Sequence, residues 1–189
     1  MSVSDQDVVR DVRRGDREAF ALLLHKYQGR LFALVLMMVR QPAGAEEVTQ
    51  DTFVRAYTHL DHYDDNRPFY HWLATIAVRL AQNWLRHHGR VVIREGAPLD
   101  SAHEPSAAAP ALSGLIADER SHQLWAAVAA LPSGERTVVT LYYREEMAVN
   151  DIARALGVTA GTVKTLLFRA RRHLRTRIQA AGLSKETSI

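Results

Sequence analysis

The chain has 189 residues, of which 47% are hydrophobic, so it is long enough for one or two small domains with buried cores. Its 24 basic and 21 acidic residues nearly cancel to a net charge of +3, and this sum points to no particular class of partner. It has no cysteine, which excludes disulfides and thiolate metal sites and fits a reducing compartment. The N-terminus lacks an apolar signal core, and the longest apolar run, Leu31 to Val39, is too short to span a bilayer. We therefore expect a cytoplasmic protein with no membrane insertion.

Apolar residues recur at helical spacing in four segments of the first half, which predicts helices over residues 4–14, 17–39, 46–60 and 69–90. Ser4 is placed to cap the first helix, and Gly15 with Asp16 separates it from the second. The second helix is apolar on all sides near its end, so we expect it at the centre of a bundle. Pro42 falls in the break before the third helix, and Pro68 can open the fourth.

The predicted third helix has an inward half and an acidic outward face. The inward residues are Ala45, Val48, Thr52, Phe53, Ala56, Tyr57 and Leu60. The residues that point away from this half are Glu47, Gln50, Asp51 and Val54. Such acids are usually just solvated, but the valine among them favours a protein-docking surface.

The charge changes sign between the third and fourth helices. From Gln41 to Asn66 there are six acids and one base, whereas from Arg67 to Arg94 there are five bases and no acid. Such a change between neighbouring segments indicates two faces with two different partners.

The predicted fourth helix carries a tryptophan among arginines. Its core stripe consists of Phe69, Leu73, Ile76, Leu80 and Trp84. An adjacent face carries Trp72, Arg79, Asn83, Arg86 and Arg90. Bases stack on aromatic rings and guanidinium groups hold the backbone, so this face suits a single strand of nucleic acid. The alternative is that Trp72 belongs to the core and that the arginines are merely solvated.

The composition changes between Glu95 and Gly114, where fourteen of twenty residues are Ala, Pro, Ser or Gly. Such a segment cannot bury enough apolar surface to fold alone, so we expect a flexible linker. Two further helices are predicted, over residues 115–131 and from Pro132 onward. Their inward residues should be Leu124, Val128 and Leu131 in the first, and Val138, Val139, Leu141 and Tyr142 in the second.

Residues 151–172 have the pattern of a helix-turn-helix. Ala153 is small at a position where two helices cross closely, and four residues later Gly157 can adopt the positive φ that ends the first helix. Thr159 can cap the second helix, and Val163 then falls inward. This spacing fits the tri-helical corner of DNA-binding domains.

The second helix of this motif has a basic outward face. Its apolar stripe comprises Val163, Leu166, Leu167, Ala170, Leu174 and Ile178. Pointing away from the stripe or lying at its flanks are Gly161, Lys164, Thr165, Phe168, Arg169 and Arg172. From Thr159 to Gly182 there are six bases and no acid, which suits a duplex lined with phosphates. The alternative is a solvated surface helix with a positive bias.

We therefore expect an all-α protein of two small helical domains, residues 1–94 and 115–189, joined by a linker over 95–114. Several short motifs occur in order along it: Gly15-Asp16 with Ala19-Phe20, then Ala45 to Phe53, Trp72-Leu73 with Ile76-Ala77, Leu131-Pro132, and Gly161 to Lys164 with Arg169 to Arg171. Each motif alone is weak. Their order and spacing resemble those of bacterial RNA polymerase sigma factors of the extracytoplasmic-function (ECF) group, group IV of the sigma-70 family.

The resemblance implies binding rather than catalysis, with no enzyme activity, cofactor or metal. The first domain would be sigma region 2 and the second sigma region 4. Core RNA polymerase would dock on Glu47, Gln50, Asp51 and Val54. The −10 promoter element would be melted and captured by Tyr63, Asn66, Trp72, Arg79, Asn83 and Arg86. The −35 element would be read as duplex DNA by Lys164, Thr165, Phe168, Arg169 and Arg172. Most members of the group are held inactive by an anti-sigma factor, so such a partner is implied too.

Two positions depart from the family pattern. Arg79 stands where the family usually has Asn, and its longer, charged side chain could change strand separation or −10 preference. The first helix of the turn motif usually begins with a Ser or Thr cap, whereas here the sequence is Met147 to Asn150. Either Asn150 caps a shortened helix or the cap is absent, at a cost of about 1 kcal/mol.

Three other classes of protein fit the sequence less well. A helix-turn-helix regulator that does not act as a sigma factor would usually carry an α/β receiver, and the first half shows no strand alternation. An enzyme lacks support, because there is no cysteine, glycine-rich phosphate loop or Ser-His-Asp pattern. A metal could in principle bind to His59, Asp61, His62, Asp64 and Asp65, but such loop residues are more often just solvated. A helical adaptor without nucleic-acid contact conflicts with the basic run after Thr159.

Overall fold

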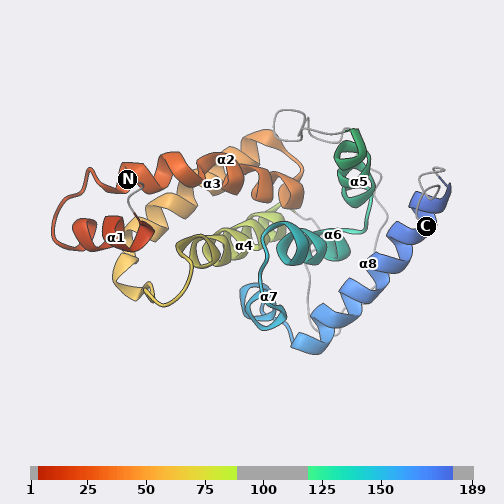
Figure 1. The fold of residues 1–189 in the computed structure, drawn as a ribbon. Coiled ribbons are helices and arrows are strands. Elements are labelled where there is room, and N and C mark those ends of the chain that lie inside the picture. Colours follow the sequence, from red (N-terminus) through yellow and green to blue (C-terminus); the bar gives the residue numbers. More distant parts are fainter. Residues whose placement is uncertain (1–3, 89–118, 181–189) are drawn as a thin grey trace. The chain divides into compact units, whose positions relative to one another are not determined.

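The computed structural model describes residues 4–88 and 119–180, which form two helical regions (Figure 1). All regular secondary structure in these two ranges is helical, as the sequence predicts. The expected linker over residues 95–114 lies outside the described residues, and so does Arg90.

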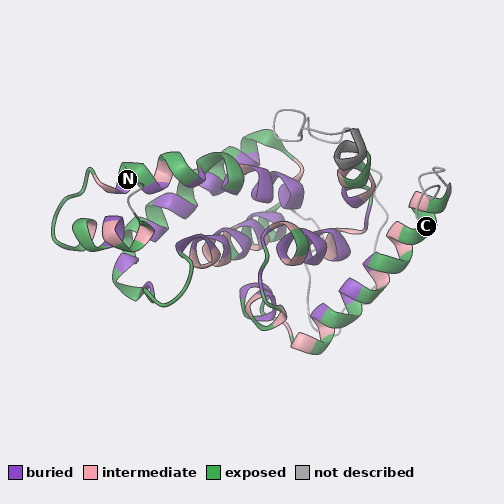
Figure 2. Cartoon of the chain, viewed as in Figure 1, coloured by how far each residue is buried: buried purple, intermediate pink, exposed green. Residues whose placement is uncertain are grey.

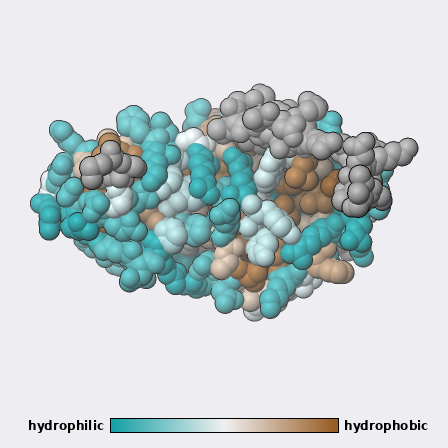
Figure 3. Space-filling model, viewed as in Figure 1, coloured by the Kyte–Doolittle hydropathy of each residue, from teal (hydrophilic) through white to brown (hydrophobic). Residues whose placement is uncertain are grey.

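The first unit is a bundle of four helices. They are α1 (Asp5–Arg13), α2 (Phe20–Val39), α3 (Pro42–Thr58) and α4 (Phe69–His87), with a short 3-10 turn, η1 (Leu60–His62), after α3. The helices α2, α3 and α4 pack pairwise against one another, and α1 packs against α2 and η1. Their buried faces are purple in Figure 2, and the first unit is mostly hydrophilic on the side seen in Figure 3.

Helix α2 is the core of this bundle. By length and composition it could cross a membrane, but more than half of its apolar window is buried inside the protein. Leu31, Leu34 and Val35 have no exposed surface. Neighbouring helices therefore cover the apolar side chains of α2, as in the bundle of a soluble protein.

The predicted helix ends are partly confirmed. The hydroxyl of Ser4 accepts the Asp7 N–H at 3.2 Å, and Gly15 adopts a φ of 109° in the turn after α1. The start of α2 was predicted too early, because the Asp16 carboxylate accepts the Ala19 N–H at 3.2 Å and holds the intervening residues in a turn. The start of α3 was predicted too late, since Pro42 already occupies its first turn.

The buried face of α4 is broader than the predicted stripe. Phe69, Leu73 and Trp84 are buried as expected, but Ile76 and Leu80 are only half-buried. Further buried positions, which the predicted stripe did not include, are Tyr70, Ala74, Ala77, Val78, Ala81 and Leu85. The physical reason is that α4 packs against both α2 and α3, and its alanines allow close approach on two sides.

The second unit is arranged around a long C-terminal helix. Its elements are α5 (Glu119–Ala129), α6 (Ser133–Val139), a π-helical turn η2 (Thr140–Arg144), α7 (Val149–Leu156) and α8 (Ala160–Ala180). Helix α8 packs against α5, α6 and α7. Val128 and Leu131 are buried as predicted, but Leu124 is 43% exposed and its inward placement was wrong. Among the side chains described for α5, the fully buried ones lie in its last turn, beyond Leu124.

Buried charges join the helices of the second unit. Arg136 in α6 donates to the carbonyls of Ala129 and Leu131 at 3.3 and 2.9 Å, which fixes the end of α5. Glu135, also buried, lies 2.7 Å from the Nδ1 of His173 in α8. Arg136 and Glu135 therefore both have polar partners, which offset much of their desolvation cost.

Candidate nucleic-acid interface

The helix-turn-helix forms as the sequence predicts. Helix α7 ends at Gly157, which adopts a φ of 70°, and the hydroxyl of Thr159 accepts the Thr162 N–H at 3.2 Å at the start of α8. Val163 is fully buried beneath the turn. Of the two alternatives for the start of α7, the structure has the uncapped one, because Asn150 lies inside the helix and Ala148 occupies the cap position.

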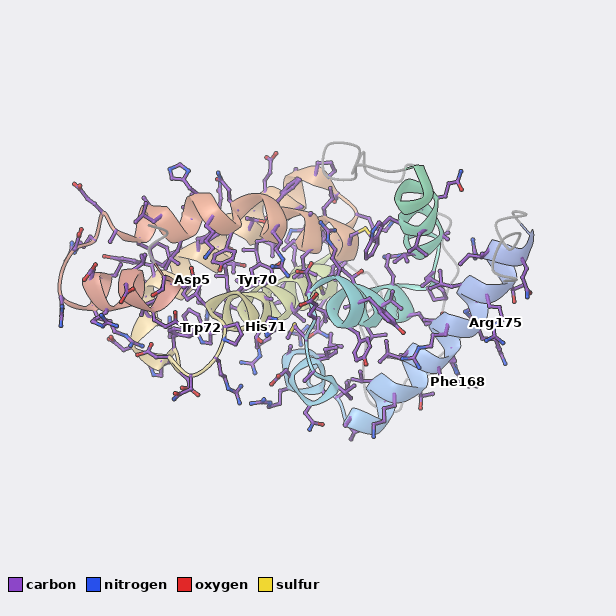
Figure 4. The ribbon with its side chains drawn as sticks, in the orientation of Figure 1. Asp5, Tyr70, His71, Trp72, Phe168 and Arg175 are labelled. Carbon is purple, nitrogen blue, oxygen red and sulfur yellow. The ribbon has the colours of Figure 1, made fainter. Side chains whose placement is uncertain are left out.

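The outward side of α8 combines bases with one exposed aromatic ring. Lys164, Thr165 and Arg172 are exposed, Arg169 is half-exposed, and Phe168 is 65% exposed. Figure 4 shows Phe168 and Arg175 on the side of α8 that faces away from α6. The Thr165 hydroxyl donates to the Gly161 carbonyl at 3.0 Å, which holds this side chain against the backbone of α8. The five residues predicted to read duplex DNA therefore lie on one accessible surface.

Arg171 lies beside this surface and was not among the predicted contacts. Its Nε donates to the Tyr143 hydroxyl at 2.9 Å, and its guanidinium lies 5.9 Å from the centre of the Tyr143 ring. Tyr143 belongs to η2 and is itself half-exposed. The pair fixes one of the six bases of α8, and helix periodicity alone could not reveal it because Tyr143 is 28 residues away in sequence.

Trp72 occupies the rim of an aromatic cluster in the first unit. Its ring centre lies 5.4 Å from that of Tyr63 and 5.6 Å from that of Phe69, and the side chain is half-buried. Figure 4 places Trp72 next to His71 near the start of α4. One side of the ring therefore packs against the core, and part of the ring is accessible to solvent. Trp72 thus belongs partly to the core and is still available to contact a base.

The other predicted residues of α4 lie along its exposed side. Arg79, Asn83 and Arg86 are all exposed, and Arg86 donates to the Asn83 side-chain oxygen at 3.1 Å. Together with Trp72 they form a surface that we call the α4 face. It is positively charged and has an aromatic ring at one end, as a single strand requires.

Tyr63 differs from the other predicted contacts because it is a core residue. It is only 4% exposed, and its hydroxyl donates to the carbonyl of Arg67. Burial raises the pKa of Tyr63 to about 12, so it stays neutral at physiological pH. Its ring supports Trp72 from beneath and does not face solvent.

Asn66 is exposed but already takes part in the turn between α3 and α4. Its backbone N–H and side-chain amide both donate to the same Asp64 oxygen, at 3.0 and 2.9 Å. These two bonds lower the pKa of the Asp64 carboxyl group. The described residues contain no group of three or more His, Asp or Glu that could hold a metal ion, so the loop residues considered as ligands do not converge.

The outward residues of α3 form the third candidate surface, which we call the α3 face. Glu47, Gln50 and Asp51 are exposed, and Val54 is 65% exposed among them. Trp84 of α4 donates its Nε1 proton to the Glu47 carboxylate at 2.9 Å, a contact that helix periodicity did not predict because the two residues are 37 positions apart. This bond fixes one acid of the α3 face in place.

Both units match known proteins in sequence. The family model for sigma-70 region 2 matches residues 23–91, and the model for sigma-70 region 4 matches residues 121–174. The RNA polymerase sigma-H factor of Pseudomonas aeruginosa is 32% identical over 173 residues, covering 88% of this chain and 90% of the relative. The ECF RNA polymerase sigma factor SigW of Bacillus subtilis is 30% identical over 178 residues, which cover 90% of this chain and 95% of SigW.

The fold is also similar to solved structures. CnrH, in complex with the cytosolic domain of CnrY, superimposes with a TM-score of 0.61 at 23% identity, over 93% of this chain and 97% of that chain. The sigma factor RpoE of Bartonella quintana, in complex with the anti-sigma factor NepR, gives a TM-score of 0.60 at 22% identity, over 85% and 96%. These two structures show the same fold, and the family models and relatives above show that the chain belongs to the ECF group of the sigma-70 family, whose members are non-enzymatic RNA polymerase subunits that direct promoter-specific transcription initiation.

Proposed function

We propose that the second unit reads the −35 promoter element as duplex DNA through the outward side of α8. The observation that carries this proposal is the accessible row of Lys164, Thr165, Phe168, Arg169 and Arg172 on the second helix of a helix-turn-helix. In this motif the start of the second helix enters the major groove. Arg169 can pair two donors with a guanine edge, and the exposed ring of Phe168 suits contact with a thymine methyl group.

In the first unit, we assign capture of the melted −10 element to the α4 face. An unstacked base needs an aromatic platform, and Trp72 offers a ring that its neighbours hold in place. Arg79 and Arg86 supply positive charge for the phosphates along the strand. Unstacking a base costs a few kcal/mol, which binding to a prepared surface can offset.

The α3 face is the proposed docking site for core RNA polymerase. It lies on a different helix from Trp72, Arg79 and Arg86, and it carries acids rather than bases. Val54 contributes exposed apolar area at one end of this face, and the neighbouring acids supply specificity and orientation. A subunit that contacts core polymerase and DNA at the same time needs a separate surface for each.

Two further assignments concern the cellular setting. The chain is a soluble sigma factor, and we place it in the cytoplasm, where core polymerase and the chromosome are found. We also propose that an anti-sigma factor holds it inactive. The support is that two proteins with this fold were solved in complexes: RpoE with the anti-sigma factor NepR, and CnrH with the cytosolic domain of CnrY.

Run-off transcription tests these assignments together. Bacterial core polymerase would be incubated with genomic DNA fragments, with and without the chain. The expected result is a set of discrete transcripts that appear only with the chain and that share upstream sequences at −35 and −10. Binding to DNA fragments without any chain-dependent transcript would favour a helix-turn-helix regulator instead.

A further inference from the structure

The last residue of α1 contacts the loop between α3 and α4 through several bonds at once. Arg13 donates from Nη1 to both carboxylate oxygens of Asp65, each at 3.0 Å. From Nη2 it donates to the carbonyls of Leu60 and Tyr63, at 2.9 and 2.7 Å. The Arg13 side chain is 26% exposed, so these charge-assisted bonds are partly shielded from water. One guanidinium group thus fixes three residues of the loop.

These bonds tie the loop to the rest of the bundle. The bonds between Asp64 and Asn66 close the turn on itself, but they do not connect it to another helix. Helix α1 is in turn attached to α2, because Asp5 accepts bonds from Lys26 and from the Tyr27 hydroxyl. The loop is therefore braced against α2 through α1.

The position of this loop affects Trp72. The carbonyl of Tyr63 accepts from Arg13, while the Tyr63 ring packs 5.4 Å from the ring of Trp72. A loop that shifted at Tyr63 would withdraw the support beneath Trp72. We propose that Arg13 is a positioning residue for −10 capture, which holds residues 60–67 in the binding arrangement before the strand arrives. The loop is then already ordered when the strand binds, so the affinity is not reduced by the entropy cost of ordering it. This inference rests on the function proposed for the α4 face.

A purely electrostatic role makes different predictions. The loop carries the acids Asp61, Asp64 and Asp65, which repel phosphates, and Arg13 neutralises one of them. Arg13→Lys keeps the charge but loses the planar fork that reaches a carboxylate and two carbonyls together. Asp65→Asn removes the acid but leaves both carbonyl bonds of Arg13 in place. Positioning therefore predicts that Arg13→Lys is defective and that Asp65→Asn is close to the parent.

The test uses the full chain and two single-stranded oligonucleotides, one with the −10 sequence of a promoter found by run-off transcription and one with that sequence scrambled. Fluorescence anisotropy gives the affinity for each, and their ratio measures discrimination. We expect Arg13→Ala to lower the affinity for the matched strand about ten-fold and to reduce the ratio. Arg13→Lys should behave similarly. Arg14→Ala is the matched control, because it removes the same charge from the adjacent, exposed position.

A general loss of stability would not change the ratio, so the ratio separates positioning from structure. The inference is overturned if Arg13→Ala discriminates as well as Arg14→Ala does, or if Arg13→Lys restores parental affinity. If Arg13→Ala does not fold, the comparison of Arg13→Lys with Asp65→Asn decides in the same way. A parent chain that fails to discriminate the two strands would refute the −10 role of the α4 face, and this inference with it.

Discussion

Gly44, near the start of α3, is predicted to be intolerant of even the smallest side chain. A Cβ built at this position would lie 2.4 Å from Cζ2 of Trp84 and 2.7 Å from its Cε2. Trp84 has little freedom to move away, because its ring stacks on His88 with centres 3.8 Å apart and its Nε1 is bonded to Glu47. Gly44→Ala should therefore displace the tryptophan and disturb the acid that it fixes on the α3 face.

The expected magnitude follows from two opposing effects. Forcing an extra methyl group into a packed site costs about 1–3 kcal/mol. Replacing glycine by alanine in a helix returns up to about 1 kcal/mol, and less near the helix start. We expect a net loss of about 1–2 kcal/mol in the free energy of unfolding of the first unit. For a domain of this size, that corresponds to a melting temperature lowered by roughly 4–16 °C.

Gly29 provides the matched control within the same unit. It lies exposed in the middle of α2, and a Cβ at this position would meet nothing within 4 Å. Gly29→Ala should therefore raise the stability by about 0.5–1 kcal/mol. Thermal unfolding followed by circular dichroism measures both variants. The reasoning is refuted if Gly44→Ala is as stable as the parent, or if both variants shift in the same direction.

Four further variants test the proposed surfaces. The double variant Asp51→Lys with Val54→Asp should reduce co-purification with core polymerase at unchanged helicity, and an undiminished yield would exclude the α3 face as the docking site. Arg169→Ala should lose about 1–3 kcal/mol of −35 discrimination, because a bidentate contact to guanine is removed. Arg175→Ala should instead weaken binding about equally on all sequences, as expected for a phosphate contact. If Arg169→Ala and Arg175→Ala lost the same amount of selectivity, both assignments would be contradicted. Trp72→Ala should bind −35 duplex normally but form fewer open complexes, as measured by permanganate reactivity of unpaired thymines; parental reactivity would mean that Trp72 serves only the core.

Features set by residues close in sequence could be predicted. Ser4, Gly157 and Thr159 act on backbone groups within a few positions, so their caps and turns are visible in the sequence itself. The buried position of Val163 follows from helix periodicity in the same way. The helix-turn-helix and its basic outward side were therefore predictable almost residue by residue.

Features set by distant residues could not be predicted in this way. Tyr63 is polar, lies in a loop and resembles a DNA contact, but its burial depends on Phe69 and Trp72 packing around it. Leu124 has helical spacing with buried neighbours, yet it lies before the buried last turn of its helix. The hydrogen bonds of Arg13 join residues that are 47 to 52 positions apart, and no local sequence pattern predicts them.

The distribution of charge in the second unit has a consequence for the ionic environment. Helix α8 carries six bases and no acid, while Glu135 and Glu145 of the same unit are buried. The exposed bases will attract DNA of any sequence and release the counterions condensed on it. If four of them each met one phosphate, a four-fold rise in salt would lower the affinity by roughly 150-fold. Because random DNA loses this contribution as well, moderate salt removes much of the competition from the rest of the chromosome and leaves the base contacts of α8 to select the promoter.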